Sequence, residues 1–272
     1  MHRITLPSTK HHFMFLEAGE IATAAHDGVK WMRHQNDLWK IDMKRFEKQI
    51  VLGEDSYVAR AEAIMSEIED LVPITRAWRN VDDVVGGLPN VPAFLAGTPQ
   101  NMRRRVRTMS ETAPLTIFMN LATSAIIDAD TVLRRGIVLL ALTRLLVEHR
   151  TVELWVGTTL DDGHHSGTAA WRIDTAPLDL ARAAFMIADV SMSRLFGYAM
   201  CEVLTDCHLG GGGQREQHAA RLREATGWHE DGLLYIPWMS VRDDMVNDPV
   251  GWIRERLAQY TSGSDSNSDS DD

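Results

Sequence analysis

Four arginines gather near residue 105 and could bind phosphate groups or an acidic partner. They are Arg103, Arg104, Arg105 and Arg107, and they follow a passage rich in glycine and proline. Arginine neutralises the phosphates of nucleic acids, so this run is the candidate for a nucleic-acid contact. The alternative is a solvated helix start whose arginines pair with nearby carboxylates.

Two groups of metal-ligating residue types lie further along the chain. The first group is Asp161, Asp162, His164 and His165, and the second is Cys201, Cys207 and His208. Neither group has the ligand spacing of a zinc site, and the glycine run 210–213 lacks the Lys-Ser/Thr ending of a phosphate-binding loop. We therefore expect no metal and no cofactor. A metal-dependent hydrolase built on the first group is a third reading.

Composition predicts a globular protein without a membrane span. Hydrophobic residues make up 44% of the 272 residues and include eight Trp, which is enough for a real core. The net charge of −10 argues against sequence-independent binding of nucleic acid. Two cysteines fit a reducing compartment, and neither a secretory signal nor a long uncharged apolar stretch is visible. We expect a cytoplasmic protein.

Residues 115 to 156 have the pattern of a strand, a helix and a second strand. Apolar runs at Leu115–Met119 and Val152–Val156 flank a helix that we expect from about Ala129 to His149. That helix is apolar over most of its circumference, which predicts that it is covered on several sides. Neither strand alternates strictly between apolar and polar residues, as expected for strands buried on both faces of a parallel sheet.

Further elements extend this α/β pattern. Strands are predicted at 81–85, at 168–173 antiparallel to the preceding strand, and at 233–236. Helices are predicted at 18–32, 55–71, 177–204 and from 249 onward. Residues 1–10 are expected to be unstructured and 86–107 to form a loop-rich passage. The segment 264–272 holds four Asp and no basic residue, and we expect it to be disordered.

The strand, the polar loop after it and the long helix together resemble a von Willebrand factor A-type domain. The loop is Asn120-Leu121-Ala122-Thr123-Ser124, and Thr175 precedes the next long helix. In that family, carboxylate and hydroxyl oxygens at such places bind a divalent cation. Asn120 and Ala122 stand where the resemblance places Asp and Ser, so it implies a degenerate site without metal. The candidate binding residues are Asn120, Thr123, Ser124 and Thr175. Alternatively, Asn120 and Ser124 cap the following helix.

A second resemblance covers the whole chain, which is similar to uncharacterised proteins encoded by tailed bacteriophages. The residues from Asp82 to Met102 and from Pro177 to Ala183 carry it. The resemblance implies a phage protein that works in the cytoplasm of the host. It transfers no catalytic residues.

These observations predict an α/β fold, a Rossmann-like three-layer sandwich of von Willebrand A type with a mostly parallel sheet. We expect an N-terminal helical and loop-rich region at 1–110, the A-type domain at 111–262 and an acidic tail at 263–272. The predicted function is that of a non-enzymatic adaptor, and by analogy with A-type domains its partner is an AAA+ ATPase. The alternative is a nucleic-acid-binding or processing protein of phage replication that uses Arg103–Arg107 and the acidic tail.

Overall fold

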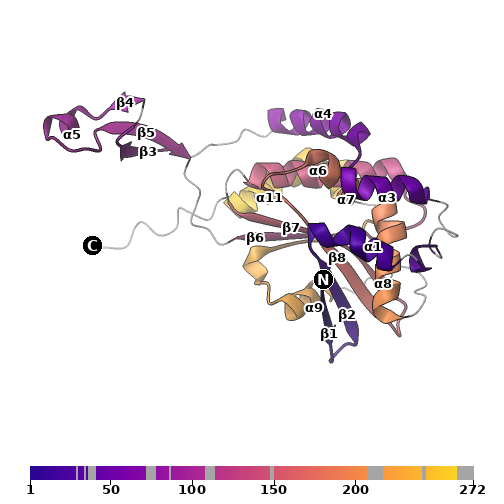
Figure 1. Ribbon diagram of the computed structural model, residues 1–272. Coiled ribbons are helices and arrows are strands. Elements are labelled where there is room, and N and C mark those ends of the chain that lie inside the picture. Colours follow the sequence, from indigo (N-terminus) through magenta and orange to yellow (C-terminus); the bar gives the residue numbers. More distant parts are fainter. Residues whose placement is uncertain are drawn as a thin grey trace.

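The protein has a mixed α/β fold with a mostly parallel six-stranded sheet and a second, three-stranded sheet (Figure 1). The computed structural model describes residues 1–28, 30–33, 35, 41–71, 78–85, 87–107, 114–147, 150–206, 217–240 and 243–261. Within these ranges, no helix combines the length and the apolar character needed to cross a membrane.

The six-stranded sheet has the strand order β1-β2-β8-β7-β6-β9. Its strands are β1 (His2–Leu6), β2 (His11–Leu16), β6 (Leu115–Asn120), β7 (Val152–Asp161), β8 (Ser166–Ile173) and β9 (Leu233–Ile236). β6 pairs in parallel with both β7 and β9, and β2 pairs in parallel with β8. The β1–β2 and β7–β8 pairs are antiparallel, as short hairpin connections require.

The central strands follow the prediction, and the N-terminal segment departs from it. The strands predicted near 115, 152, 168 and 233 are β6, β7, β8 and β9, and β8 is antiparallel to β7 as expected. Residues 1–10, expected to be unstructured, contain β1. Because β1 and β2 lie in the same sheet as β6, the boundary predicted near residue 110 does not divide the main fold. β2 pairs with a strand far along the chain, which no local pattern can indicate.

Side chains alternate between the two faces of the sheet and build two apolar layers. Leu115, Ile117 and Met119 of β6 join the larger cluster, and Phe118 joins the smaller one. Because both faces are covered, β6 reads as a continuous apolar run in the sequence.

Most helices contribute to the larger cluster. They are α1 (Ile21–Asp27), α3 (Met43–Leu52), α4 (Asp55–Leu71), α6 (Ala129–Val147), α7 (Leu180–Ala188), α8 (Tyr198–Thr205), α10 (Asp244–Asn247) and α11 (Pro249–Thr261). α6 contacts β7 and also packs against α4, α7, α10 and α11. The prediction that this helix is covered on several sides is therefore confirmed.

The opposite face of the sheet packs against α9 (His218–Thr226). Leu222 of α9 lies in a cluster with Phe13, Phe118 and Trp155 of the strands. The helix ends at Gly227, whose φ of 73° is the left-handed conformation that glycine adopts without strain. Two 3-10 turns, η1 (Ala18–Glu20) and η3 (Glu230–Gly232), precede α1 and β9.

The helix predicted over 177–204 is interrupted. α7 ends at Ala188, and a π-helical segment at Met192–Gly197 leads into α8. The Asp189 carboxylate accepts hydrogen bonds from the backbone N–H and hydroxyl of Ser191, at 2.8 and 2.6 Å, and so competes with helical bonding. The apolar periodicity of this stretch does not reveal that local competition.

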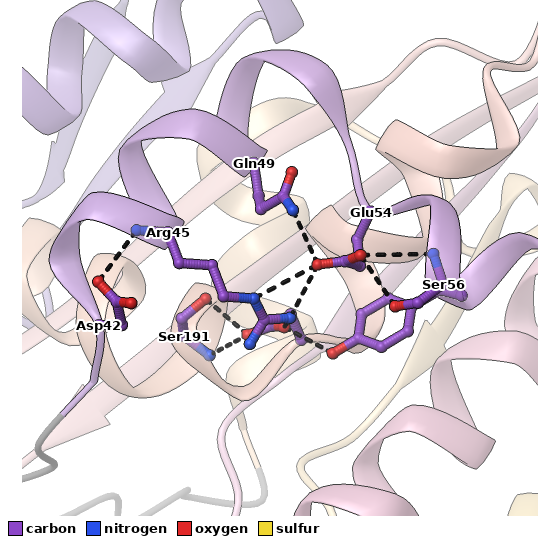
Figure 2. A network of polar contacts seen from close by, with 8 residues as sticks. Asp42, Arg45, Gln49, Glu54, Ser56 and Ser191 are labelled. Carbon is purple, nitrogen blue, oxygen red and sulfur yellow. Dashed lines mark hydrogen bonds and ion pairs between the residues drawn. The ribbon is translucent and has the colours of Figure 1, made fainter.

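A polar network fastens the N-terminal helices to this interruption (Figure 2). The Asp189 carboxylate accepts from the Tyr57 hydroxyl of α4 at 2.7 Å and from the Arg45 guanidinium of α3 at 3.3 Å. Arg45 and Gln49 also donate to Glu54, at 3.0 and 2.8 Å. Burial and the Asp189 carboxylate raise the pKa of Tyr57 to about 12, so its hydroxyl stays a donor at neutral pH. The network ties α3 and α4 to the segment that follows α7.

The second sheet belongs to a small unit at residues 78–107, which we call the arm. It contains β3 (Trp78–Asp83), β4 (Leu88–Pro89), α5 (Val91–Leu95) and β5 (Met102–Arg107), and its strand order is β3-β5-β4. Figure 1 shows the arm apart from the six-stranded sheet. The joining segments, 72–77 and 108–113, lie outside the described residues. The arginine run lies in β5 and not in a helix start, and the passage predicted to be loop-rich contains two strands and a helix.

Candidate functional site

The carboxyl ends of β6 and β9 form the first candidate site. β6 leads through α6 to β7 on one side, whereas β9 lies on the other side of β6. In open α/β sheets, ligands bind outside the carboxyl ends of the strands where the connections diverge in this way. Two loops meet there, because Thr123 forms a parallel bridge with Met239, and Met239 N–H donates to the Ala122 carbonyl at 3.0 Å.

The predicted loop residues Asn120 and Thr123 are buried at this edge. The Asn120 side-chain oxygen accepts from Ala122 N–H at 2.9 Å, which closes a tight turn after β6. The Asn120 amide nitrogen and the Thr123 hydroxyl have no hydrogen-bond partner among the described residues. These side chains shape the loop and are not open to solvent.

Arg135, which the sequence did not single out, joins the two strand ends. Its guanidinium donates to the Asn120 carbonyl at 3.0 Å and to the Pro237 carbonyl, and its Nε lies 2.8 Å from the Asp243 carboxylate. The Arg135 side chain is 3% exposed and that of Asp243 is 11% exposed. Burial lowers the pKa of Arg135 and Asp243 opposes that shift. The buried Arg135 guanidinium therefore pairs with the Asp243 carboxylate at this edge.

Ser124 and Thr175 do not meet each other. The Ser124 carbonyl accepts from Arg194 at 3.2 Å near the carboxyl end of β6. The Thr175 hydroxyl donates to the Val152 carbonyl at 2.9 Å, at the start of β7 and hence at the opposite edge of the sheet.

The residue that caps α6 is Asp128, and not Asn120 or Ser124 as the alternative interpretation expected. Asp128 accepts from the Thr131 N–H and hydroxyl at 2.9 and 2.7 Å, one turn into the start of α6.

A cavity of about 310 Å³ opens beside the two loops. Its lining includes Ile126 and Asp128 from the loop after β6, and Ser240 and Asp243 from the loop after β9. Among the described residues, no group of three or more His, Cys, Asp or Glu is arranged to hold a metal ion. The structure thus brings Asn120, Thr123 and Ser124 to one edge of the sheet, beside this cavity.

The first group of possible metal ligands, from Asp161 to His165, forms the turn between β7 and β8. Asp162 accepts from the backbone N–H groups of His164 and His165 in the β7–β8 turn, at 2.8 and 2.7 Å. Asp161 accepts from Gly163 N–H at 2.8 Å and lies 3.8 Å from Arg221. These contacts explain the residues as turn formers.

Cys201 is fully buried, and burial raises the pKa of its thiol to about 12. A thiol that stays protonated is a poor nucleophile and a poor metal ligand at neutral pH. Three other sequence candidates, Cys207, His208 and the glycine run 210–213, lie outside the described residues, as does the acidic tail 264–272.

A buried histidine cluster links the sheet to α9, and no local pattern in the sequence indicates it. The Thr168 hydroxyl lies 2.8 Å from His11 Nε2 and 2.9 Å from His218 Nε2, and the Tyr235 hydroxyl lies 2.8 Å from His218 Nδ1. Burial, aided by His218 and Arg221, lowers the pKa of His11 to about 2, and burial with Arg221 lowers that of His218 to about 3. Both rings are neutral at pH 7. Thr168 is 0% exposed, so its hydroxyl is not accessible to a substrate and the cluster is a structural contact.

The arginines of the arm form cross-strand ion pairs. Arg103 Nε lies 3.4 Å from Asp82, and Arg104 Nη2 lies 3.0 Å from Asp83. β3 and β5 are antiparallel with Asp82 opposite Arg103, which explains the pairing. The backbones of Arg105 and Arg107 lie in β5, and their side chains lie outside the described residues. Arg103 and Arg104 therefore pair with nearby carboxylates, as the alternative interpretation expected, but the run lies in a strand and the carboxylates come from the neighbouring strand.

The arm exposes most of its large apolar side chains, and these residues form the second candidate site. We call them the apolar patch, and they are Val84 (60% exposed), Val85 (71%), Leu88 (57%), Val91 (55%), Phe94 (65%) and Leu95 (79%). Outside the arm, only four described large apolar residues are comparably exposed, and they are Met1, Val51, Leu52 and Ile126. None of the three apolar core clusters in the described structure includes a residue of the arm.

Comparison with known proteins places the chain in a family. Residues 7–261 match the profile of a family described as Domain of unknown function (DUF7192). The chain belongs to this family. The matched range includes the arm and every strand of the six-stranded sheet except β1, which precedes residue 7. Searches of curated proteins and of solved structures found no match.

Proposed function

We propose that this member of the family is a non-enzymatic protein-interaction protein, an adaptor, and that the apolar patch of the arm is its binding surface. The single observation that carries the proposal is the exposure of the six patch residues, each at least 55% accessible to solvent. Soluble proteins rarely leave such groups of apolar side chains in water unless another molecule covers them.

The size of the arm explains why the patch is exposed. A unit of this length has too little volume to bury its own apolar core. Its described contacts are polar instead. Asn90 accepts from Ala93 N–H at the start of α5 and donates to Asp82, and its N–H donates to the Asn101 carbonyl. A partner that covered the patch would bury apolar side chains, each worth about 1.5–3 kcal/mol when fully buried.

The charge of the arm indicates what kind of partner fits. The arm holds five Arg and two Asp and so carries a net charge of +3, in a chain whose net charge is −10. We therefore expect a protein surface with an apolar groove and an acidic rim. Asp82 and Asp83 form ion pairs with Arg103 and Arg104. Because these two guanidinium groups already have anionic partners, a protein is favoured over a phosphate backbone as the ligand.

The finer fold assignment and the partner class are part of the proposal. The parallel β6–α6–β7 unit with β9 on the other side of β6 supports a Rossmann-like core of von Willebrand A type. By analogy with that fold alone, an AAA+ ATPase is the first partner to test. We keep the host cytoplasm of a bacteriophage infection as the proposed setting, on the resemblance of residues 82–102 and 177–183.

A capture experiment tests the adaptor role. Tagged protein is recovered from cells that produce it naturally, after nuclease treatment, and bound proteins are quantified by mass spectrometry. The arm variant carries Val85→Ser, Phe94→Ser and Leu95→Ser. The matched control carries Val51→Ser, Leu52→Ser and Ile126→Ser, which are exposed apolar residues outside the arm.

We expect one protein to be recovered in stoichiometric amount by the natural chain and by the control, and to be lost at least about tenfold with the arm variant. Equal recovery by the arm variant would refute the patch as the binding surface. In a parallel capture without nuclease, recovery of nucleic acid and of no protein partner, sensitive to Arg103→Gln and Arg104→Gln, would support the alternative of a nucleic-acid-binding protein.

A further inference from the structure

We propose that a second site, separate from the arm, binds an organic ammonium cation in an aromatic pocket at the carboxyl end of α9. The pocket has a volume of about 350 Å³ and lies between the last turn of α9 and the segment from β1 to η1. Its lining residues are Met1, His2, Ile4, Phe15, Glu17, Glu20, Trp155, Ala225, Thr226 and Trp228. The volume is near the lower end for small-ligand sites, so it suits a small cation better than a nucleotide.

Three aromatic rings form one wall of the aromatic pocket. The ring centroids of Phe15 and Trp155 are 5.7 Å apart, those of Phe15 and Trp228 are 6.2 Å apart, and those of Trp155 and Trp228 are 6.0 Å apart. The interplanar angles are 88°, 74° and 46°, so the rings present faces in different directions. Aromatic faces carry negative potential and attract quaternary or alkylated ammonium groups.

Two carboxylates and the carboxyl end of a helix border the same space. Glu17 and Glu20 line it, with side chains 51% and 38% exposed. Ala225 and Thr226 belong to the last turn of α9, where the helix dipole places partial negative charge. Each carboxylate already contacts a cation, because Glu17 lies 2.9 Å from Arg172 and Glu20 pairs with the N-terminal ammonium. Both carboxylates therefore already have a positively charged partner, which an ammonium ligand would share or displace.

One buried polar group limits the kind of cation. The Trp155 indole N–H is buried and has no hydrogen-bond acceptor among the described residues, although Trp155 lines the pocket. A ligand oxygen that reached this N–H after a small shift of the ring would satisfy the donor. Choline has this arrangement, because its hydroxyl oxygen is two carbons from the nitrogen. A trimethyl-lysine side chain presents the same cation, with its peptide carbonyl groups at the far end of a four-carbon stem.

The test measures binding of choline and of a short trimethyl-lysine peptide by proton NMR. We expect the N-methyl signal of at least one ligand to move upfield, because ring currents act on a group seated against aromatic faces. The neutral isostere 3,3-dimethylbutan-1-ol should bind about tenfold more weakly than choline. The relative affinities of choline and the peptide identify whether the cation is free or carried by a protein.

Two variants locate the site on the full-length chain. Trp228→Leu keeps apolar volume but removes a ring, and we expect it to weaken binding about tenfold. Trp252→Leu alters a half-buried Trp that lines a different cavity, and we expect no change. If Trp228→Leu does not fold, the double variant Glu17→Gln and Glu20→Gln replaces it, with an expected severalfold loss.

Three results would overturn the proposal. The first is the absence of any shift with both cations at millimolar concentration. The second is equal binding of the neutral alcohol, which would show a pocket that recognises apolar volume alone. The third is an equal loss of binding in Trp228→Leu and Trp252→Leu. None of these outcomes depends on the arm, so the adaptor proposal is tested separately.

Discussion

A single buried guanidinium holds the carboxyl ends of β6 and β9 together. Arg135 reaches two backbone carbonyls and the Asp243 carboxylate, and almost none of its side chain is exposed. Removing one partner of a buried ion pair leaves the other charge unpaired in a region of low polarity. Arg135 is therefore expected to dominate the stability of this edge.

The first prediction concerns that residue. Arg135→Ala should lower the free energy of unfolding by about 3–5 kcal/mol, because it strands Asp243 and two carbonyl oxygens. Chemical denaturation measures the change. The matched control is Arg134→Ala, an exposed neighbour on the same helix, which should stay within about 0.5 kcal/mol. Similar losses in both variants would contradict the role assigned to Arg135.

The second prediction concerns the buried histidine cluster. His11 and His218 have pKa values of about 2 and 3 in the folded protein, against 6.5 for an ordinary histidine. The unfolded chain therefore binds protons that the folded chain excludes. The contribution of the two neutral rings to the free energy of unfolding is fully present above pH 6.5. It is lost as the pH falls toward the pKa values of the folded protein. Below pH 6.5, the two histidines together should cost about 2–3 kcal/mol per pH unit.

Denaturation between pH 7.5 and 5.5 measures this slope in a range where carboxylates hardly titrate. Replacing both rings, with His11→Gln and His218→Gln, should flatten the pH dependence even if the variant is less stable overall. Replacing the exposed His164 and His165 by Gln serves as the control. A double variant of His11 and His218 that kept the natural slope would disprove the account of these residues.

The sequence could indicate some of these residues and not others. The polar loop after β6 was visible as a break in an apolar run, and Asn120, Thr123 and Ser124 do lie together at one edge of the sheet. Thr175 fitted the resemblance only by its place before a helix. It follows β8, which ends at the opposite edge of the sheet. Arg135 sits within an apolar helix beside exposed Arg134, and only the packing distinguishes the two. His11 of β2 and His218 of α9 are distant in the sequence and meet where α9 packs on the sheet, so no local spacing reveals them.

At the scale of elements, α6 and α7 approach closely at one glycine. A Cβ atom added to Gly136 would lie 2.6 Å from the Ala188 Cβ and 2.9 Å from its Cα. Real Cβ atoms do not come so close to backbone atoms, so the two helices would have to separate. The absence of a side chain at Gly136 therefore sets the distance between the long central helix and α7.

The third prediction follows from this contact. Gly136→Ala should destabilise the protein by about 1–3 kcal/mol through overpacking, even though Ala favours helix. Thermal unfolding provides the measurement. Gly19→Ala is the control, because a Cβ there would meet nothing within 4 Å, and the change should be small. An unchanged or raised melting temperature in Gly136→Ala would be inconsistent with the observed packing.

Most of the regular elements and the antiparallel pairing of β8 with β7 could be predicted from local patterns, whereas the pairing of strands distant in the sequence could not. β6, α6, β7, β8 and β9 follow the apolar runs and the turn signals. β1 and β2 were missed because β2 pairs with β8, which is distant in the sequence. The arm was read as a loop-rich passage because its glycines and prolines punctuate very short elements, such as the two residues of β4. Polar competition at Asp189 broke a helix that apolar spacing predicted to be continuous.

At the scale of the whole molecule, the arm and the six-stranded fold use separate contacts. The strands of the arm pair only with one another in the described structure, and its residues are absent from the apolar clusters. The rest of the described chain therefore does not draw its apolar packing from the arm. This separation is what an appendage for binding another protein requires.

The fourth prediction is that the main fold tolerates loss of the arm. Replacing residues 78–107 by a Gly/Ser linker should leave a cooperative thermal transition within a few degrees of the natural one. The same deletion should abolish partner capture. Loss of the cooperative transition would show that the arm stabilises the main fold, contrary to the contacts seen here.

Amide hydrogen exchange of the arm, free and with the captured partner, tests the adaptor role most directly. We predict that exchange across residues 84–95 slows at least about tenfold in the complex, since binding must cover the apolar patch and order its backbone. Exchange in the loops at 121–128 and 237–240 should not change. Unaltered exchange in the arm, with protection at those two loops instead, would contradict the claim and would place the binding surface at the carboxyl edge of the sheet.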